Sequence, residues 1–154
     1  MNLILWRHAD AEDGEVDLKR ALTRRGMKQA AAMADWLRHH APEGATLLAS
    51  RALRSQQTAA ALTNRCEVTQ RLDPDRGVKE LLAAVKWPDG GGESGCVIAV
   101  GHQPTLGRTA ALLLGGVEAD WTIRKGAIWW FTSRMRGGET RAVLRTVLAA
   151  EQVM

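Results

Sequence analysis

Short apolar runs alternate along the chain with longer segments in which apolar residues recur every three or four positions. Strands are predicted at residues 3–6, 46–49, 96–100, 128–132 and 142–148, and helices at 23–40, 50–64, 77–86 and from Pro104 onward. Such alternation is typical of α/β proteins with a mostly parallel sheet. The last two runs are joined by a loop that contains Gly137 and Gly138, as in a hairpin. The pattern therefore predicts an α/β fold, a three-layer α/β/α sandwich with a mostly parallel central sheet and a C-terminal antiparallel hairpin, with residues 1–154 as a single domain.

Two of the predicted helices combine an apolar stripe with a capping residue. For the helix at 23–40, with Thr23 as N-cap, the predicted inward side chains are Met27, Ala30, Ala31, Ala34 and Leu37. For the helix at 50–64, with Ser50 as N-cap, they are Leu53, Ala60 and Ala61. We expect both faces to pack on the sheet.

Composition and charge narrow the class of protein. A chain of 154 residues can bury a sizeable core, and its two cysteines, Cys66 and Cys96, are too few and too far apart for a disulfide framework or a metal site. The net charge of +4 is spread along the chain, which favours an acidic or phosphorylated partner over nucleic acid. No apolar run is long enough for a signal peptide or a membrane span. We therefore expect a cytoplasmic protein with no membrane partner.

Polar residues follow three of the predicted strands directly. They are Arg7 and His8 after the first strand, Ser50, Arg51 and Arg54 after the second, and Gly101 and His102 after the strand at 96–100. Because the carboxyl ends of parallel strands meet at one edge of a sheet, these side chains should line one crevice. Two imidazoles and several guanidiniums with few carboxylates predict a site for an anion such as phosphate.

Four segments resemble the histidine phosphatase superfamily in order and spacing. LWRHADAE resembles its R-H-G segment, ASRALRSQQTA its S-P-x-x-R-x-x-Q-T segment and VIAVGHQPTL its second-histidine segment, while LKRALTRRGMKQAAAMADWL is similar to its L-T-x-x-G-x-x-Q-A helix. The small size and the GHQPTL and RKGAI stretches resemble most the short phosphohistidine phosphatase branch. The resemblance covers about residues 2–132.

The resemblance implies a catalytic role for four residues. His8 would attack phosphorus and form a phosphohistidine intermediate, which water then hydrolyses. Arg7 and Arg54 would hold the phosphoryl oxygens and keep His8 neutral, and His102 would donate a hydrogen bond to the same oxygens. Neither a metal nor another cofactor is implied.

The same resemblance extends to further phosphate-binding candidates and to departures from the family pattern. The binding candidates besides Arg7 and Arg54 are Ser50, Arg51, Gln103 and Lys125. Ala9 replaces the usual glycine, Arg51 stands where proline is common, and Gln103 follows the second histidine. No residue matches the glutamate that larger members use as general acid; Glu80, Asp10 and Glu12 are the remaining candidates.

Three functions remain open on the sequence. Because imidazole leaves more readily than an alkoxide, a site without a strong acid suits phosphohistidine in a protein partner. The second candidate uses the same chemistry on a small phosphorylated metabolite or nucleotide. The third is a phosphate-binding regulatory module without turnover. The oligomeric state is left open.

Overall fold

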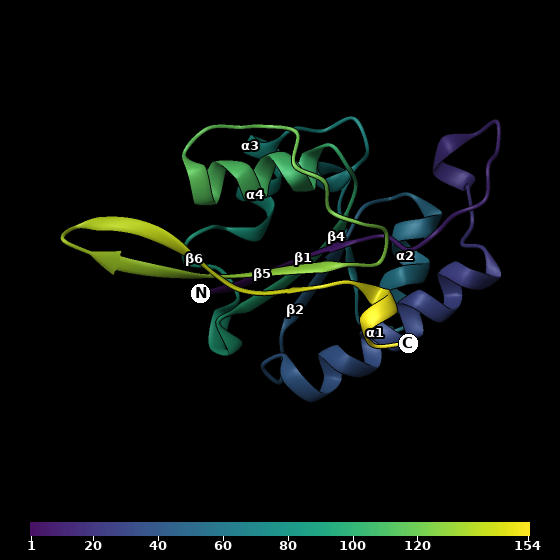
Figure 1. The fold of residues 1–154 in the computed structure, drawn as a ribbon, viewed down its shortest axis with the longest axis horizontal. Coiled ribbons are helices and arrows are strands. Elements are labelled where there is room, and N and C mark those ends of the chain that lie inside the picture. The colour runs from purple at the N-terminus through teal and green to yellow at the C-terminus, as the bar shows by residue number, and fades with distance from the viewer.

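The computed structural model describes residues 1–154, and it confirms the predicted fold class. The elements are β1 (Asn2–Arg7), α1 (Arg24–His40), β2 (Thr46–Ala49), α2 (Leu53–Ala60), β3 (Glu67–Val68), α3 (Val78–Val85), β4 (Cys96–Gly101), α4 (Thr105–Gly115), β5 (Ile128–Arg136) and β6 (Glu139–Leu148). They form one six-stranded sheet in the order β3-β2-β4-β1-β5-β6. The first four strands of this order are parallel, and β5 and β6 are antiparallel to their neighbours. The helices α3 and α4 lie on one face of the sheet, and α1 and α2 lie on the other (Figure 1).

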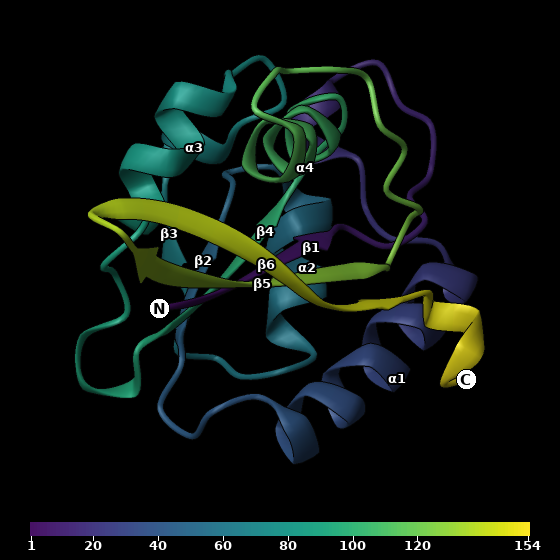
Figure 2. The ribbon, with the colours of Figure 1, turned by 60° about the vertical axis from the view of Figure 1, so that its left-hand side comes forward.

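The strand β1 contributes to both hydrophobic cores. Leu3 and Leu5 pack with α3 and α4, whereas Ile4 and Trp6 pack with α1 and α2. This explains its continuous apolar run, because alternate side chains of a strand covered on both sides meet different layers. Arg7 is the last residue of β1 and His8 follows it, at the point where the chain leaves the sheet. Figure 2 shows β1 in the middle of the sheet.

The start of α1 agrees with the prediction, but its buried face is displaced. The Thr23 hydroxyl accepts a hydrogen bond from the N–H of Gly26 at 2.9 Å, as an N-cap does. Ala30, Ala34 and Leu37 are buried as expected, together with Gly26, Gln29 and Met33. Met27, 49% exposed, and Ala31 were expected inside and are at the surface. The helix is rotated because Gly26 packs against Asp10, whose carbonyl oxygen would lie 2.0 Å from a Cβ at that position.

The prediction for the second helix is wrong in extent, cap and orientation. The helix α2 begins at Leu53 after the N-cap residue Ala52, and it ends at Ala60 rather than near Asn64. Leu53 and Ala60 are exposed and Ala61 is half-buried, whereas the buried residues of α2 are Arg54, Ser55, Thr58 and Ala59. The apolar pattern misleads here because this helix turns its polar side toward the end of the sheet.

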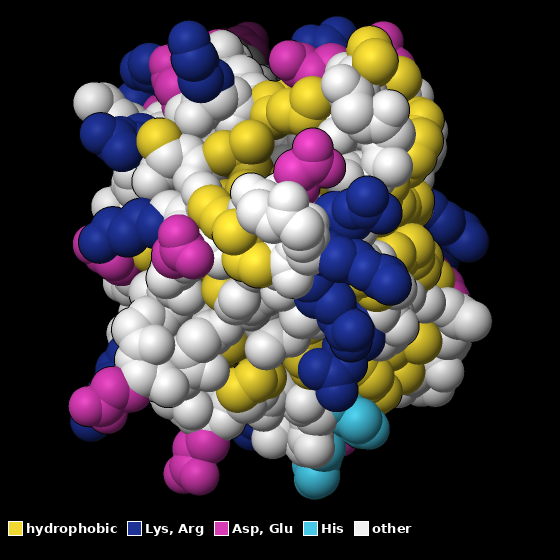
Figure 3. Space-filling view, turned by 90° about the vertical axis from the view of Figure 1, so that its left-hand side faces the viewer, with side chains coloured by type: hydrophobic (Ala, Val, Ile, Leu, Met, Phe, Trp, Pro, Cys, Tyr) yellow, Lys and Arg dark blue, Asp and Glu magenta, His cyan; other side chains and the backbone are white.

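The hairpin β5–β6 extends beyond the end of β1 at which the chain starts. Its strands pair Arg134 directly with Arg141, and the guanidinium of Arg145 lies 4.5 Å from the centre of the Trp130 ring. Figure 3 views this end of the molecule and shows a band of basic side chains beside exposed hydrophobic ones. The band lies at the opposite end of the sheet from Arg7 and His8. No helix of the protein is both long enough and apolar enough to cross a bilayer.

Candidate active site

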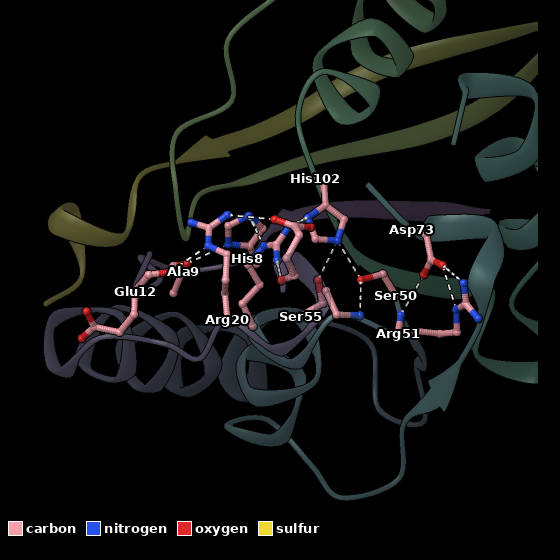
Figure 4. Close-up of polar contacts among 12 residues, drawn as sticks. His8, Ala9, Glu12, Arg20, Ser50, Arg51, Ser55, Asp73 and His102 are labelled. Carbon is pink, nitrogen blue, oxygen red and sulfur yellow. Dashed lines mark hydrogen bonds and ion pairs between the residues drawn. The ribbon is translucent and has the colours of Figure 1, made fainter. Parts of the chain in front are cut away.

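Three neighbouring parallel strands bring His8, Ser50 and His102 to one edge of the sheet. The strand β4 pairs with both β1 and β2, so residues that follow the three strands become neighbours. The rings of His8 and His102 have their centres 5.0 Å apart, and both side chains are buried (Figure 4). The predicted meeting of these two distant histidines is therefore observed.

Hydrogen bonding fixes the tautomer of His8. Its Nδ1 lies 2.8 Å from the carbonyl oxygen of Ala9, which can only accept a hydrogen bond. In the neutral ring the proton must therefore be on Nδ1, and the lone pair of Nε2 is unprotonated and acts as an acceptor. The Nε of Arg54 points at this atom from 3.4 Å. The geometry leaves Nε2 as the unprotonated nitrogen of the ring.

His102 is held between two hydroxyl groups and a guanidinium. Its Nε2 lies 2.7 Å from the Ser50 hydroxyl and 3.1 Å from the Ser55 hydroxyl, and its Nδ1 lies 3.4 Å from a terminal nitrogen of Arg54. The Ser50 hydroxyl also accepts a hydrogen bond from the N–H of Ala52 at 3.2 Å. Ser50 thus does not cap α2 as an N-cap residue. It orients the imidazole of His102.

Arg54 is a buried cation at the centre of this cluster. Its side chain is only 4% exposed, and its hydrogen-bonding partners are His8, His102 and Asp17. Its terminal nitrogens donate to the carbonyl oxygen of Asp17 at 2.7 Å and to the carboxylate of Asp17 at 3.0 Å. The short 3₁₀ turn Asp17–Lys19 therefore holds the guanidinium of Arg54 in place, facing both imidazoles.

Asp17 and Arg20 are members of the site that the sequence analysis missed. Arg20 donates to the Asp17 carboxylate at 3.1 Å and to the carbonyl oxygen of Glu12 at 2.7 Å (Figure 4). Asp17 therefore bridges two guanidiniums, one from the segment after β1 and one from α2. Residues 12–19 are exposed and have no apolar period, so nothing in the sequence pattern indicates that they fold back over Arg54.

Burial and positive charge favour the neutral form of both histidines. Desolvation, with the charges of Arg54, Arg7 and Arg20, lowers the pKa of His8 to about 4, although the hydrogen bond to Ala9 acts in the opposite direction. Desolvation and the neighbouring His8 and Arg54 lower the pKa of His102 to about 2. The sequence analysis attributed the neutrality of His8 to the arginines, but burial is the larger cause.

The lowered pKa of His8 predicts that acid destabilises the fold before ordinary carboxylates titrate. Between pH 6.5 and about 4 the unfolded chain binds a proton at His8 that the folded chain does not bind, so the free energy of unfolding falls as the pH falls. Through His8 alone the loss is on the order of 3 kcal/mol. Urea unfolding at a series of pH values should show this decrease, and a His8→Asn variant should show a shallower one. Equal pH slopes for the two proteins would contradict the assignment.

Arg7 is the last residue of β1 and directly precedes His8. Its terminal nitrogen donates to the carbonyl oxygen of Ile123 at 2.8 Å, and its Nε is buried without a hydrogen-bonding partner. The N–H of Gly126 bonds the carbonyl oxygens of both Arg7 and His8, at 3.1 and 3.2 Å. The segment that leads into β5 is therefore tied to the backbone at Arg7 and His8.

The structure gives the other binding candidates partners within the protein. Arg51 is exposed and forms an ion pair with the buried carboxylate of Asp73 at 2.5 Å. The Gln103 amide donates to the carbonyl oxygen of Trp121 and accepts from the N–H of Gly107, both at 2.7 Å. Lys125 donates to Asp10 at 3.0 Å. Of these three, none contacts either histidine, and a role for them in phosphate binding remains a prediction.

The candidates for a general acid do not face the two imidazoles as proton donors. Hydrogen bonds from Thr23 and then Lys125 lower the pKa of Asp10, which keeps it a carboxylate. Glu80 lies on α3 and pairs with Arg76 at 3.4 Å. Glu12 is exposed, and its backbone oxygen rather than its carboxylate contacts Arg20. The site thus contains cations and neutral imidazoles. Its carboxylate is that of Asp17, which contacts Arg54.

Removing the Asp17 carboxylate should weaken the hold on Arg54. In Asp17→Asn the amide can still accept one hydrogen bond, but the charge that fixes two guanidiniums is lost. We expect an increase of about tenfold in the inhibition constant of inorganic phosphate or tungstate, since one charge-assisted hydrogen bond contributes roughly that factor. Competition assays measure it, with Asp35→Asn on the outer face of α1 as a matched control. Tighter binding of the anion by Asp17→Asn would instead mean that Asp17 competes with phosphate for Arg54.

Sequence and structure comparisons place the chain in a family. The profile of the histidine phosphatase superfamily (branch 1) matches residues 3–87. The chain is also 31% identical over 108 residues to the uncharacterized protein ML1117 of Mycobacterium leprae, a match that covers 67% of this chain and 63% of that protein, less than two thirds of its length. This chain belongs to the histidine phosphatase superfamily, as the four sequence segments predicted.

Solved structures share the whole fold. The protein histidine phosphatase SixA, in complex with tungstate, superposes with a TM-score of 0.82 and 25% identity over 100% of both chains. The mycobacterial glucosyl-3-phosphoglycerate phosphatase Rv2419c has a TM-score of 0.70 at 19% identity, over 94% of this chain and 97% of its own, which is a likeness of fold alone. The profile match shows the family, and the solved structures show the shared fold.

Proposed function

We propose that the protein is a phosphatase that transfers a phosphoryl group to His8 and then to water, and that its substrate is phosphohistidine in a protein partner. The observation that carries the proposal is the unprotonated Nε2 of a buried neutral His8, with the Nε of Arg54 3.4 Å away and His102 alongside. A phosphoryl transfer requires a nucleophile and positive groups that stabilise the negative charge of the transferring phosphoryl group.

In the first step the lone pair of His8 Nε2 forms a bond to phosphorus while the bond from phosphorus to the leaving group breaks. The electron pair of that bond goes to the leaving nitrogen. Arg54 and Arg7 stabilise the negative charge of the transferring group. The hydrogen bond from Nδ1 to Ala9 stabilises the phosphorylated ring, which gains positive charge when Nε2 is substituted.

His102 acts on the same oxygens through its Nδ1. Arg54 can only donate, so its contact with Nδ1 leaves the proton of the neutral ring on Nε2, where it donates to the Ser50 hydroxyl. Once Arg54 donates to a phosphoryl oxygen instead, the Ser50 hydroxyl can donate to Nε2 and the ring proton moves to Nδ1. That N–H then donates to a phosphoryl oxygen bound by Arg54. Ser50 is in this account a positioning residue rather than a phosphate ligand.

In the second step a water molecule attacks phosphorus, the bond to Nε2 breaks and phosphate leaves. The low pKa of His8 makes its imidazole a good leaving group as well as a neutral nucleophile. In the first step a leaving alkoxide would need a proton, and no protonated carboxyl group faces the site to donate one. An imidazole that carries a proton on its other nitrogen leaves without such help, which favours phosphohistidine as substrate. The likeness to SixA, a protein histidine phosphatase that binds the tetrahedral oxyanion tungstate, supports the same substrate.

A small phosphorylated metabolite is the second candidate, favoured by the fold shared with Rv2419c. The test compares kcat/KM for a phosphohistidine peptide, an aryl phosphate and a sugar phosphate. We expect the order to follow leaving-group quality, with the phosphohistidine peptide first and the sugar phosphate slowest. A faster reaction with the sugar phosphate would overturn the assignment of substrate. Phosphate binding without turnover of any of the three would indicate a regulatory binding module.

A further inference from the structure

A polar pocket of about 400 Å³ lies beside the candidate active site, and of its lining residues the mechanism above uses only Arg7. Its walls carry four cationic side chains, Arg7, Arg25, Arg124 and Lys125, and two carboxylates, Asp10 and Glu151. No hydrophobic side chain lines it. The segment into β5, the start of α1 and the C-terminal turn, which lie side by side in Figure 2, enclose it. Arg7 and Asp10 add the end of β1 and the residues after it, so the pocket is built from four separate parts of the chain.

The pocket shares one residue, Arg7, with the candidate active site. Arg7 belongs to both places, because it precedes His8 and also lines the pocket wall. The backbone around Gly126 is bonded to the carbonyl oxygens of Arg7 and His8. The pocket wall is thus attached, through Arg7 and the segment around Gly126, to the backbone of His8, the residue that receives the phosphoryl group in the proposed mechanism.

Positive charge in the pocket is only partly neutralised within the protein. Lys125 pairs with Asp10 at 3.0 Å and Arg25 with Glu151 at 3.4 Å. The side chain of Arg124 is exposed and has no hydrogen-bonding partner. The buried Nε of Arg7 also has none.

The start of α1 adds to this excess. Its first turn contains Arg24 and Arg25 and no acidic residue, although the N-terminus of a helix favours negative charge. An anion in the pocket would offset the repulsion among these groups and the helix dipole. The cations and the helix end together therefore indicate an anionic ligand.

We propose that this pocket binds a second anionic group of the substrate, the carboxylate of an acidic side chain that neighbours the phosphohistidine in the protein partner. The inference rests on the proposed function and adds a determinant of specificity to it. Guanidinium groups match the planar geometry of a carboxylate. Arg25, Arg124 and Lys125 are at the surface, so an acidic side chain on the surface of a protein can reach them. A second phosphate or carboxylate of a small molecule has the same chemistry, and the experiment separates the two sources.

The experiment measures kcat/KM for matched phosphohistidine peptides that carry either glutamate or glutamine at each neighbouring position in turn. The wild-type protein and Arg124→Gln are compared, with Arg136→Gln at the tip of the distant hairpin as a control of equal charge. An aryl phosphate, which has no second anion, reports the basal reaction. Inhibition by pyrophosphate relative to phosphate reports capture of a small molecule with two anionic groups.

We expect the wild-type protein to prefer glutamate over glutamine at one position or more by about tenfold, the factor that a charge-assisted hydrogen bond contributes. Arg124→Gln should lose most of this preference, while Arg136→Gln should keep it, and both should hydrolyse the aryl phosphate as the wild type does. Absence of any preference for glutamate overturns the proposal while the basal reaction continues. If pyrophosphate alone depends on Arg124, the protein source of the anion is wrong. Failure of the basal reaction in the wild type instead overturns the proposed function.

Discussion

The His8→Ala variant should lose at least about 10⁴-fold in kcat on every phosphorylated substrate, because removal of a covalent nucleophile eliminates the reaction path itself. The loss should appear in kcat rather than KM, since Arg54, Arg7 and His102 remain to bind the phosphoryl group. Steady-state assays with the phosphohistidine peptide and with the aryl phosphate measure it.

His39→Ala is the matched control for this variant. His39 is exposed at the end of α1, where its Nδ1 contacts the carbonyl oxygen of Asp35. Its replacement removes an imidazole without touching the site, and kcat should be unchanged. A His8→Ala protein that is folded by circular dichroism and retains more than about one hundredth of the wild-type kcat would show that His8 is not the nucleophile.

Arg54→Ala should reduce kcat/KM by roughly 10³-fold, at the upper end of the loss seen when one preorganised donor to a developing negative charge is removed. The guanidinium of Arg54 contacts both histidines and is held by two bonds to Asp17, so its loss removes a charge and also loosens the turn that covers the site. Arg54→Lys should remain impaired by about 10²-fold, because a single ammonium group cannot replace the forked donor geometry.

Arg65→Ala controls for the loss of a positive charge, since Arg65 is exposed beyond the end of α2. It should leave kcat/KM unchanged. If the kcat/KM of Arg54→Lys equalled that of the wild type, Arg54 would contribute only its charge. The forked donor geometry of its guanidinium would then have no part in the reaction.

Much of the fold was predictable because apolar continuity and burial coincide in the central strands. Residues 3–6 and 96–100 form uninterrupted apolar runs and became β1 and β4, which lie next to each other in the middle of the sheet. The edge strand β3 was not predicted, because its two residues are exposed and have no pattern to recognise. The inward face of α2 was predicted wrongly because the prediction placed apolar residues inside, whereas the buried residues of this helix include Arg54 and Ser55.

The candidate site was predictable as far as it depends on strand ends. His8 and His102 follow adjacent parallel strands, so topology alone brings them together. The contacts of Asp17 with Arg54 and of Asp73 with Arg51 depend on loops that fold back across 37 and 22 positions of the chain. The pattern of neighbouring residues in the sequence does not indicate contacts between such distant positions. For this reason the bridging role of Asp17 was missed, and the pairing of Arg51 with Asp73 was not foreseen.

The most direct test of the central claim is to trap the phosphorylated protein during turnover and to map the modified residue by mass spectrometry. We predict phosphate bound through nitrogen, stable to base and released by acid, on the peptide that contains His8. Phosphate on any other residue, or steady turnover with no phosphorylated protein at any quench time, would contradict the account.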